Sequence, residues 1–342
     1  MTSRGALTCL AVTGVGEVTR GDDLAEIIAA RANLVDGDIL VVTSKVVSKS
    51  EGRVVALDAT TAQARETDRV VARRGATAIV RTHHGLVMAA AGVDASNTAP
   101  GTVVLLPVDP DSSARELRAR LATGSRRNIA VLVTDTSGRA WRIGQTDIAI
   151  GAAGIEPMHD YAGRTDDYGN LLEVTAPAVA DEIAGAADLV KGKLGRCPAA
   201  VVRGLSDLVL PTGEDGPGAR ALLRDESFDM FGYGARDAVL AAVGGDPSSH
   251  RGFGAAASAE HVIDVLSHLA GDAGSATIGA DDQVDVLLRS TPRPAPLSER
   301  EVGRLEGRLS AAAFAMGWLP AVRSAPGTDD LSVRLGFRRR TP

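Results

Sequence analysis

An apolar segment, residues 129–133, leads directly into a polar segment that contains Asp135, Thr136 and Arg139. The apolar residues predict a buried strand, so that a carboxylate, a hydroxyl and a guanidinium follow its carboxyl end. Ligands commonly bind at this end of the strands in open α/β sheets. Because carboxylate oxygens bind hard cations and a guanidinium binds phosphate, the grouping suits a metal-bound phosphate.

A second carboxylate, Asp94, follows another apolar segment, residues 88–93. Its alternative interpretation is a local turn, because an Asp side chain can hydrogen-bond to the backbone two residues on, and Ser96 and Asn97 make similar local bonds. A turn is also the alternative for Asp135. Asp94 and Asp135 are therefore candidate metal ligands, and a purely structural turn is the alternative for each.

Ser44 and Lys49 follow a third apolar segment, residues 38–43. A hydroxyl and an ammonium at a strand end can meet a phosphate or a carboxylate. The alternative is a capped turn followed by a solvated lysine. If the segment is helical, Lys45 and Lys49 share a face because they are four residues apart.

The familiar phosphate-binding loops are absent from the sequence. No G-x-x-x-x-G-K-[ST] segment occurs, and Gly14-Val-Gly16 has Thr19 where a dinucleotide-binding fingerprint would place its third glycine. A plain turn is the alternative for Gly14 and Gly16. Any nucleotide must therefore be bound by another arrangement.

The composition limits the function classes. The 37 Lys and Arg residues against 43 Asp and Glu residues give a net charge of -6 without a block of like charge, which argues against nucleic acid and a polybasic membrane anchor as partners. The two cysteines, Cys9 and Cys197, have no neighbours at ligand spacing, so neither a disulfide framework nor a cysteine-rich metal site is expected. With no export signal, we expect a cytoplasmic protein that binds small molecules.

The elements that must position these residues alternate between strands and helices, which predicts an α+β (mixed α/β) fold. Strands are predicted at residues 6–12, 38–43, 78–81, 102–106, 128–134 and 199–203. Helices are predicted at residues 23–32, 112–121, 176–190 and 235–242, with Asp111 or Ser112 as the N-cap of the second.

A change in composition divides the chain. Residues 244–258 are rich in Gly, Ser and Ala and predict a linker between a domain at 1–243 and a small α+β domain at 259–342. In the second domain we expect helices at 259–270 and 298–316 and strands at 283–288 and 331–337.

Four segments in order carry a family resemblance. They span residues 14–24, 41–53, 84–97 and 134–151, the last with continuations at 174–182 and 189–193. Together they resemble the coenzyme F420-0:L-glutamate ligases, also called F420-0:γ-glutamyl ligases, including the N-terminal domain of the actinobacterial two-domain enzyme. The resemblance covers about residues 6–243, which would form the catalytic domain.

The resemblance implies an enzyme that forms carbon–nitrogen bonds. Members of the family join L-glutamate to coenzyme F420-0 through γ-linked amide bonds, use GTP with Mg²⁺ or Mn²⁺, and have a mixed α/β fold that forms a homodimer. A carboxylate reacts with an amine only after its oxygen has become a leaving group. An acyl phosphate made with the γ-phosphoryl group of GTP would supply one.

The resemblance also assigns roles to residues. Asp94 and Asp135 would share one cation, Thr136 would bind a second through an oxygen, and Asp135 and Lys49 would be catalytic. Contacts to the nucleotide or coenzyme would come from Val15, Gly16, Glu17, Val18, Ser44, Lys49, Asn97, Lys191, Gly192 and Lys193.

Lys193 departs from the family pattern, because some members have there a side-chain oxygen that binds the second cation. A protonated lysine cannot bind a metal. We therefore expect Lys191 and Lys193 to contact phosphate directly. The alternatives are that Thr136, GTP and water hold the second ion, or that both lysines merely complement a helix dipole.

The C-terminal part is a further departure. In the two-domain enzyme the partner domain is nitroreductase-like, binds flavin and reduces the dehydro precursor of the coenzyme. Residues 259–342 are too few for such a domain and match none of its segments, so no flavin is expected and the role of this part stays open. The alternatives to a ligase are a bifunctional ligase and reductase, or a non-catalytic coenzyme-binding protein.

Overall fold

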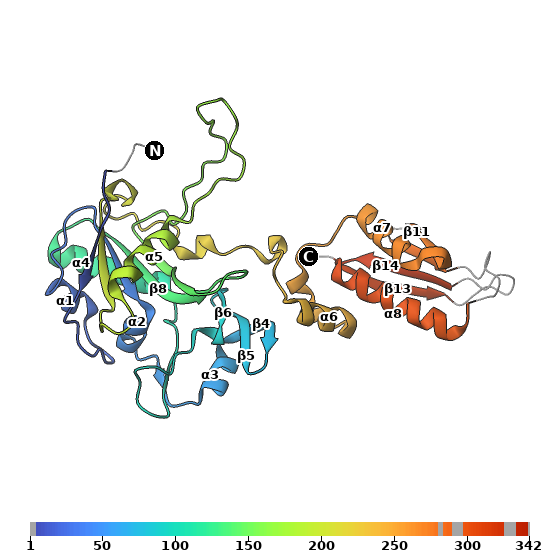
Figure 1. Ribbon diagram of the computed structural model, residues 1–342, viewed down its shortest axis with the longest axis horizontal. Coiled ribbons are helices and arrows are strands. Elements are labelled where there is room, and N and C mark those ends of the chain that lie inside the picture. The colour runs from blue at the N-terminus through green and yellow to red at the C-terminus, as the bar shows by residue number, and fades with distance from the viewer. Residues whose placement is uncertain (1–4, 280–282, 289–296, 325–332, 341–342) are drawn as a thin grey trace. The chain divides into compact units, whose positions relative to one another are not determined.

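The computed structural model describes residues 5–279, 283–288, 297–324 and 333–340. The chain divides into two compact units, Met1–Arg69 with Thr77–Leu223, and Val70–Ala76 with Arg224–Pro342. Helices and several separate sheets confirm the α+β class (Figure 1). The first unit ends at Leu223, whereas the sequence placed the end of the first domain at residue 243.

The first unit contains a five-stranded sheet in the order β1–β10–β2–β8–β9. Its strands are β1 (Thr8–Val12), β10 (Ala199–Arg203), β2 (Ile39–Thr43), β8 (Ala130–Gly138) and β9 (Gln145–Ala153). The neighbours β2 and β8 run parallel, and the other neighbouring pairs are antiparallel. The parallel pair therefore brings two carboxyl ends to the same edge of the sheet.

Helices cover both faces of this sheet, which explains why its central strands are apolar throughout. Leu40 and Val42 of β2 belong to one core cluster, together with residues of helices α1 (Leu24–Ala29) and α4 (Pro110–Ser125). The alternate residues Ile39 and Val41 belong to a second cluster with helix α5 (Val179–Lys191). These four side chains of β2 are 0% exposed, so the strand is fixed from both sides.

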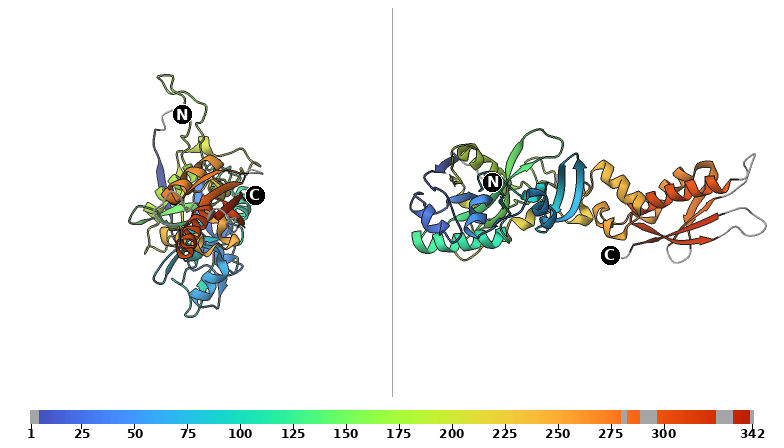
Figure 2. Two further views of the ribbon diagram at one scale, coloured as in Figure 1. Left: turned by 90° about the vertical axis from the view of Figure 1, so that its right-hand side faces the viewer. Right: turned by 90° about the horizontal axis from the view of Figure 1, so that it is seen from below.

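Two smaller sheets and two short helices lie outside the five-stranded sheet. They are β3 (Val54–Val55) with β7 (Val103–Val104), β4 (Thr67–Arg74) with β5 (Thr77–Thr82) and β6 (Val87–Ala89), α2 (Ser44–Ser50) and α3 (Ala59–Glu66). The part of β4 that follows Arg69 belongs to the second unit. Residues 156–178, which join β9 to α5, extend away from the sheet as a looped arm (Figure 2). Backbone hydrogen bonds such as Tyr161 N to Thr175 O, at 3.0 Å, hold the arm together.

Every element predicted from the sequence has an observed counterpart, with ends that differ by a few residues. The predictions missed α2, α3 and several strands, of which β9 matters most for the site. Strand β9 begins with the polar residues Gln145, Thr146 and Asp147, and this obscured its apolar alternation. No helix in the described part of the chain is long and apolar enough to cross a membrane.

The N-terminus of α4 differs from the prediction. Its N-cap is Asp109, whose side chain accepts a hydrogen bond from Ser112 N at 2.9 Å, and not Asp111 or Ser112. Pro110 occupies the first turn, as Pro often does, and this shifts the cap one residue earlier. Asp111 is buried and its Oδ1 accepts hydrogen bonds from Ala152 N at 2.9 Å and Ala219 N at 2.7 Å.

The second unit contains a four-stranded antiparallel sheet in the order β11–β12–β14–β13. Its strands are β11 (Gly274–Ile278), β12 (Val284–Leu288), β14 (Val333–Arg339) and β13 (Trp318–Ser324). Helices α7 (Ala259–Ala270) and α8 (Glu299–Ala315) pack against it. Residues 331 and 332 of the strand predicted at 331–337 lie outside the described residues.

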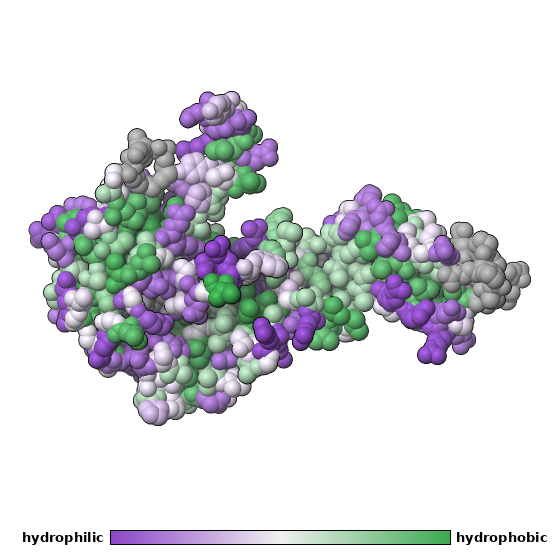
Figure 3. Space-filling view, in the orientation of Figure 1, coloured by the Kyte–Doolittle hydropathy of each residue, from purple (hydrophilic) through white to green (hydrophobic). Residues whose placement is uncertain are grey.

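The segment predicted as a linker, residues 244–258, contains a 3-10 helix (Pro247–Phe253) in which His250 is buried. The preceding helix α6 (Ala235–Gly244) also belongs to the second unit and exposes Val239, Leu240 and Val243, which contribute to the hydrophobic surface at α6 in Figure 3.

Replacing Asp111 tests its role in joining α4 to the sheet. We expect Asp111→Ala to lower the free energy of unfolding by about 2–4 kcal/mol, because two buried N–H groups lose their acceptor. Asp109→Ala removes only an N-cap and should cost about 1 kcal/mol. Urea unfolding of both variants measures the difference, and equal losses would contradict the assignment.

Candidate functional site

The parallel strands β2 and β8 bring two of the predicted site residues together. Their register pairs Thr43 with Thr134, so the next residues, Ser44 and Asp135, emerge at the same edge of the sheet. The Ser44 hydroxyl donates a hydrogen bond to Asp135 Oδ1 at 3.1 Å. Two residues that are distant in sequence thus contact each other because β2 and β8 pair in parallel. Asp135 and Thr136 still lie within β8, which continues to Gly138 through its pairing with β9, and not beyond the end of the strand as the sequence predicted.

A cavity of about 560 Å³ lies at this edge of the sheet. The predicted residues that line it are Gly16, Glu17, Ser44, Lys49, Asp94, Asn97, Asp135, Thr136, Lys191, Gly192 and Lys193. They come from all four of the segments that carry the family resemblance. Val15 and Val18 are instead core residues, 5% and 2% exposed, so their side chains do not line the cavity.

Among the carboxylates that the structure describes, Asp135 has the most strongly shifted pKa. Its pKa is raised to about 6, first because burial disfavours the charged form and further because Asp147 and Asp94 add negative charge nearby. Hydrogen bonds from the Ser44 side chain and the Thr136 backbone act in the opposite direction. A positive charge near Asp135 would therefore stabilise its ionised form.

Asp94 forms the local turn that the sequence allowed and also lines the cavity. Its Oδ1 accepts a hydrogen bond from Ser96 N at 2.6 Å, which is the local turn, while its Oδ2 forms an ion pair with Lys45 Nζ at 2.5 Å in the cavity. Burial works to raise the pKa of this carboxyl, but the hydrogen bonds from Lys45 and Ser96 outweigh it and the pKa is lowered. Asp94 is therefore ionised and lies inside the candidate site.

Lys45 and Lys49 both lie on the side of α2 that lines the cavity, as their spacing predicted. Lys49 is not a solvated lysine, because it is only 7% exposed. Its ammonium donates to Glu17 Oε1 at 2.5 Å and to the Asn97 carbonyl oxygen at 3.0 Å. The hydrogen bond from Lys49 lowers the pKa of Glu17.

Asp147 is a cavity residue that sequence analysis missed. It is 3% exposed and forms an ion pair with Lys191 Nζ at 2.6 Å. It also accepts hydrogen bonds from the hydroxyls of Thr134 and Thr136, both at 3.0 Å. A β-hairpin prediction for residues 130–153 would have found it, because Asp147 pairs with Thr136 across the two strands.

The two predicted phosphate-binding lysines have different surroundings. Lys191 is buried in the last turn of α5, where its ammonium binds Asp147 and donates to Thr134 Oγ1 at 3.2 Å. Gly192 then ends the helix with a φ of 59°, a left-handed conformation that favours glycine. Lys193, beyond this turn, is exposed and lines the cavity. Its ammonium is the more accessible of the two.

The donor set suits a hard cation. In the described part of the chain, no group of three or more His, Cys, Asp or Glu side chains could hold a metal ion. Mg²⁺, however, is commonly bound by one or two carboxylates and completes its shell with water and substrate phosphates. Asp135 and Asp94 line one cavity, and a divalent cation would offset both the burial and the neighbouring negative charge that raise the pKa of Asp135. The residues therefore fit the predicted ion.

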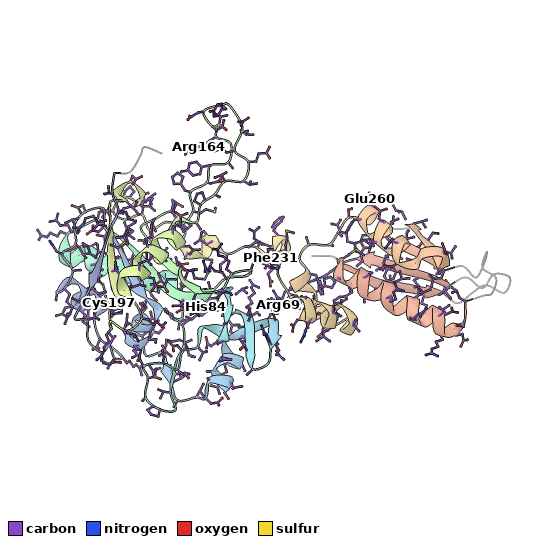
Figure 4. The ribbon with its side chains drawn as sticks, viewed as in Figure 1. Arg69, His84, Arg164, Cys197, Phe231 and Glu260 are labelled. Atoms are coloured by element: carbon purple, nitrogen blue, oxygen red, sulfur yellow. The ribbon has the colours of Figure 1, made fainter. Side chains whose placement is uncertain are left out.

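One of the two thiols and the histidine of the third resembling segment contact backbone carbonyl oxygens. Cys9 and Cys197 are both free, as expected, and Cys197 donates a hydrogen bond to the Val12 carbonyl oxygen at 3.3 Å (Figure 4). A ring nitrogen of His84 lies 2.9 Å from the Pro107 carbonyl oxygen. Cys197 and His84 are thus tied to the backbone.

Comparison with known proteins gives a consistent match. The sequence model of the family described as F420-0:Gamma-glutamyl ligase matches residues 14–204. A coenzyme F420:L-glutamate ligase of Archaeoglobus fulgidus is 41% identical over 216 residues, which cover 57% of this chain and 86% of that protein. The Methanopyrus kandleri protein of the same name is 42% identical over 236 residues, with coverages of 63% and 93%. That of Methanothermobacter thermautotrophicus is 37% identical over 254 residues, with coverages of 66% and 98%.

Lys191 and Lys193 form a matched pair for a stability experiment. We expect Lys191→Met to lower the free energy of unfolding by about 3–5 kcal/mol, because Asp147 would be left buried without its partner. Lys193→Met changes an exposed residue and should stay within about 0.5 kcal/mol. Chemical unfolding at pH 7 measures both. An equal loss of unfolding free energy in the two variants would contradict a stabilising role for the buried ion pair between Lys191 and Asp147.

The pH dependence of stability in Asp135→Asn tests the raised pKa of the buried Asp135 carboxyl. The folded-state pKa is raised, so the carboxyl stabilises the fold fully below about pH 4 and loses that contribution as the pH rises through about 6. Without divalent cations, the variant should therefore be more stable than the wild type at pH 7–8 by roughly 1–3 kcal/mol, with the gap closing toward pH 4.

Thermal unfolding in a chelator between pH 4 and 8 measures this difference. The control is Asp36→Asn, because the Asn128 backbone N–H lowers the pKa of that exposed carboxyl. This variant should not gain stability at pH 7. A destabilised Asp135→Asn protein at pH 8 would contradict the predicted cost of burying an ionised Asp135 carboxylate.

Proposed function

Because the chain belongs to the F420-0:gamma-glutamyl ligase family, we propose that it joins L-glutamate to coenzyme F420-0 through a γ-linked amide bond. GTP would be the co-substrate and Mg²⁺ or Mn²⁺ the metal. We extend the proposal to a homodimer and a cytoplasmic location, both as expected from the sequence. The observation that carries the chemistry is the contact of Ser44 with Asp135 inside one cavity that also holds Asp94 and Lys49.

The first step would activate the coenzyme. An oxygen of its carboxylate attacks the γ-phosphorus of GTP, the bond from that phosphorus to the bridging oxygen breaks, and GDP leaves with its electron pair. The product is an acyl phosphate. Such a transfer depends on positioning and on neutralising the charge of the phosphate oxygens, for which the cavity offers Lys45, Lys49 and Lys193.

The second step would form the amide. The amine nitrogen of glutamate attacks the acyl carbon, inorganic phosphate leaves with its oxygen, and the nitrogen loses a proton. Asp135 is suited to receive a proton near neutral pH because burial raises its pKa to about 6. This role and metal binding exclude one another at the same oxygen, and we favour metal binding because Asp94 lines the same cavity.

Asp135 and Asp94 would hold one cation, and Thr136 would offer its hydroxyl oxygen to a second. The Thr136 hydroxyl donates its proton to Asp147 at 3.0 Å, which leaves the lone pairs of its oxygen for a ligand. A bound divalent cation would neutralise phosphate charge. By holding Asp147, Lys191 would fix the orientation of Thr136 and would not contact phosphate itself.

Lys49 would bind the anionic part of a substrate by exchanging partners. In the structure its ammonium is paired with Glu17, which is 58% exposed at the side chain and lies on the cavity wall. A phosphate or carboxylate group that enters the cavity would compete with Glu17 for this ammonium. Lys49 would thus bind the substrate group in place of Glu17.

A turnover assay tests the proposal. Incubation with F420-0, L-glutamate, GTP and Mn²⁺ should give products heavier by one or more glutamyl units, measured by mass spectrometry. Asp135→Asn should lower the rate by roughly 100-fold or more, since it removes a charge that holds the metal. The exposed Asp36→Asn variant, which lies outside the cavity, should retain its rate.

The same samples separate the alternatives. Coenzyme binding without any mass increment would overturn the ligase and favour a non-catalytic binding protein. A yellow purified protein with a flavin spectrum would support the bifunctional ligase and reductase instead. Full activity of Asp135→Asn would remove this residue from the site, even if the wild type is a ligase.

A further inference from the structure

The second unit has a cavity of its own, of about 600 Å³, within the size range of small-molecule sites. Its wall is formed by Glu226, Ser227, His250, Arg251, Gly254, Ala255, Ala256, Gly317, Arg339 and Arg340. These residues come from segments on either side of α7 and α8 and belong to one compact unit. Small residues dominate the uncharged part of this wall, so a ligand could approach the backbone closely.

The buried side chain of this cavity is His250, which is 1% exposed. Among the described residues, neither of its ring nitrogens has a hydrogen-bond partner. The backbone groups of His250 itself and of Phe314 lie near the ring and act to raise its pKa, as weak hydrogen bonds do, but neither makes a hydrogen bond of normal geometry with a ring nitrogen. A buried polar group normally has a partner, so an unpaired imidazole in a cavity wall indicates a ligand that supplies one.

The imidazole is held rigidly from its apolar side. Its ring centroid lies 4.4 Å from that of Phe314 and 6.2 Å from that of Phe253, and these two phenyl rings pack edge to face at 5.9 Å. Burial, and then the charge of Arg340, lower the pKa of His250. A neutral imidazole provides one N–H donor and one acceptor.

The charged residues of the wall are mostly basic. The wall contains Arg251, Arg339 and Arg340 with one carboxylate, Glu226, whose Oε2 lies 3.9 Å from Arg251 Nη1. Arg339 also donates to the Ala256 carbonyl oxygen at 3.3 Å. Three guanidinium groups with one carboxylate leave a positive balance, which favours an anion.

We propose that this cavity binds a small organic anion whose carboxylate or phosphate group contacts Arg340 and Arg251 and accepts a hydrogen bond from His250. Arginine matches either group through paired N–H donors, and the cavity volume leaves room for an attached organic body. The proposal does not depend on the ligase activity, because every residue it uses lies in the second unit.

Site-resolved NMR of the full chain with isotope-labelled histidine tests the proposal. The His250 ring signal is assigned by its loss in His250→Gln. The carboxylate probe is the dipeptide γ-glutamylglutamate, the phosphate probe is guanosine monophosphate, and potassium chloride at equal ionic strength is the control. We expect at least one probe to shift the His250 signal saturably, and the probe that does so identifies the anionic group.

Matched arginine variants complete the test. Arg340→Gln should weaken probe binding by about 10-fold, as expected for the loss of one hydrogen bond to a charged group. Arg338→Gln, on β14 two residues before Arg340 and outside the cavity wall, should change binding less than about 2-fold. If Arg340→Gln does not fold, Arg251→Gln takes its place. The proposal is overturned if neither probe moves the His250 signal, if chloride moves it equally, or if the cavity variant and Arg338→Gln behave alike.

Discussion

The parallel pairing of β2 with β8 is the constraint on which the candidate site depends. In a parallel pair both carboxyl ends lie at one edge, and the register that pairs Thr43 with Thr134 places Ser44 beside Asp135. Side chains that are 0% exposed fix β2 from both faces. A slip of one residue would exchange the two faces of the strand, misfit the side chains in both cores and bring Asp38 or Thr43 into the buried apolar run, so the register is specified. The precision of the site is therefore a consequence of core packing.

Charge balance within the cavity follows from this geometry. Asp94 is paired with Lys45 and Asp147 with Lys191, whereas the ion pairs of the described residues do not include Asp135. Asp135 has the raised pKa, and its two carboxylate neighbours contribute to the shift. The fold thus pairs Asp94 and Asp147 with its own lysines, while Asp135, on β8, has no ion-pair partner among the described residues. These two ion pairs offset part of the negative charge of the acidic residues that line the cavity, which are Glu17, Asp94, Asp135, Asp147 and Asp188.

Sequence analysis succeeded where one local pattern determined the outcome. Apolar segments such as residues 38–43 and 129–133 can only be buried strands or helices, and the polar residues that follow them were expected at a ligand site. The neighbour relation between Ser44 and Asp135 was not predictable, because strand order depends on long-range packing. Asp147 was missed for a related reason, since its role arises from cross-strand pairing with Thr136. Asp111 was misassigned as a helix cap because an Asp side chain that accepts hydrogen bonds from buried backbone N–H groups is of the same residue type as a helix cap.

The two lysines near the end of α5 show how one backbone angle separates two roles. From the sequence, Lys191 and Lys193 formed a single basic group that could replace a metal ligand. Gly192 ends the helix in a left-handed conformation, so Lys191 stays in the core with Asp147 while Lys193 lies at the surface of the cavity. The accessible charge of the segment is therefore one ammonium and not two. Lys191 instead acts through Asp147 on the Thr136 hydroxyl, because Asp147 accepts hydrogen bonds from both. The departure from the family pattern at Lys193 thus changes the charge presented to a substrate while leaving Thr136 oriented by the same buried pair.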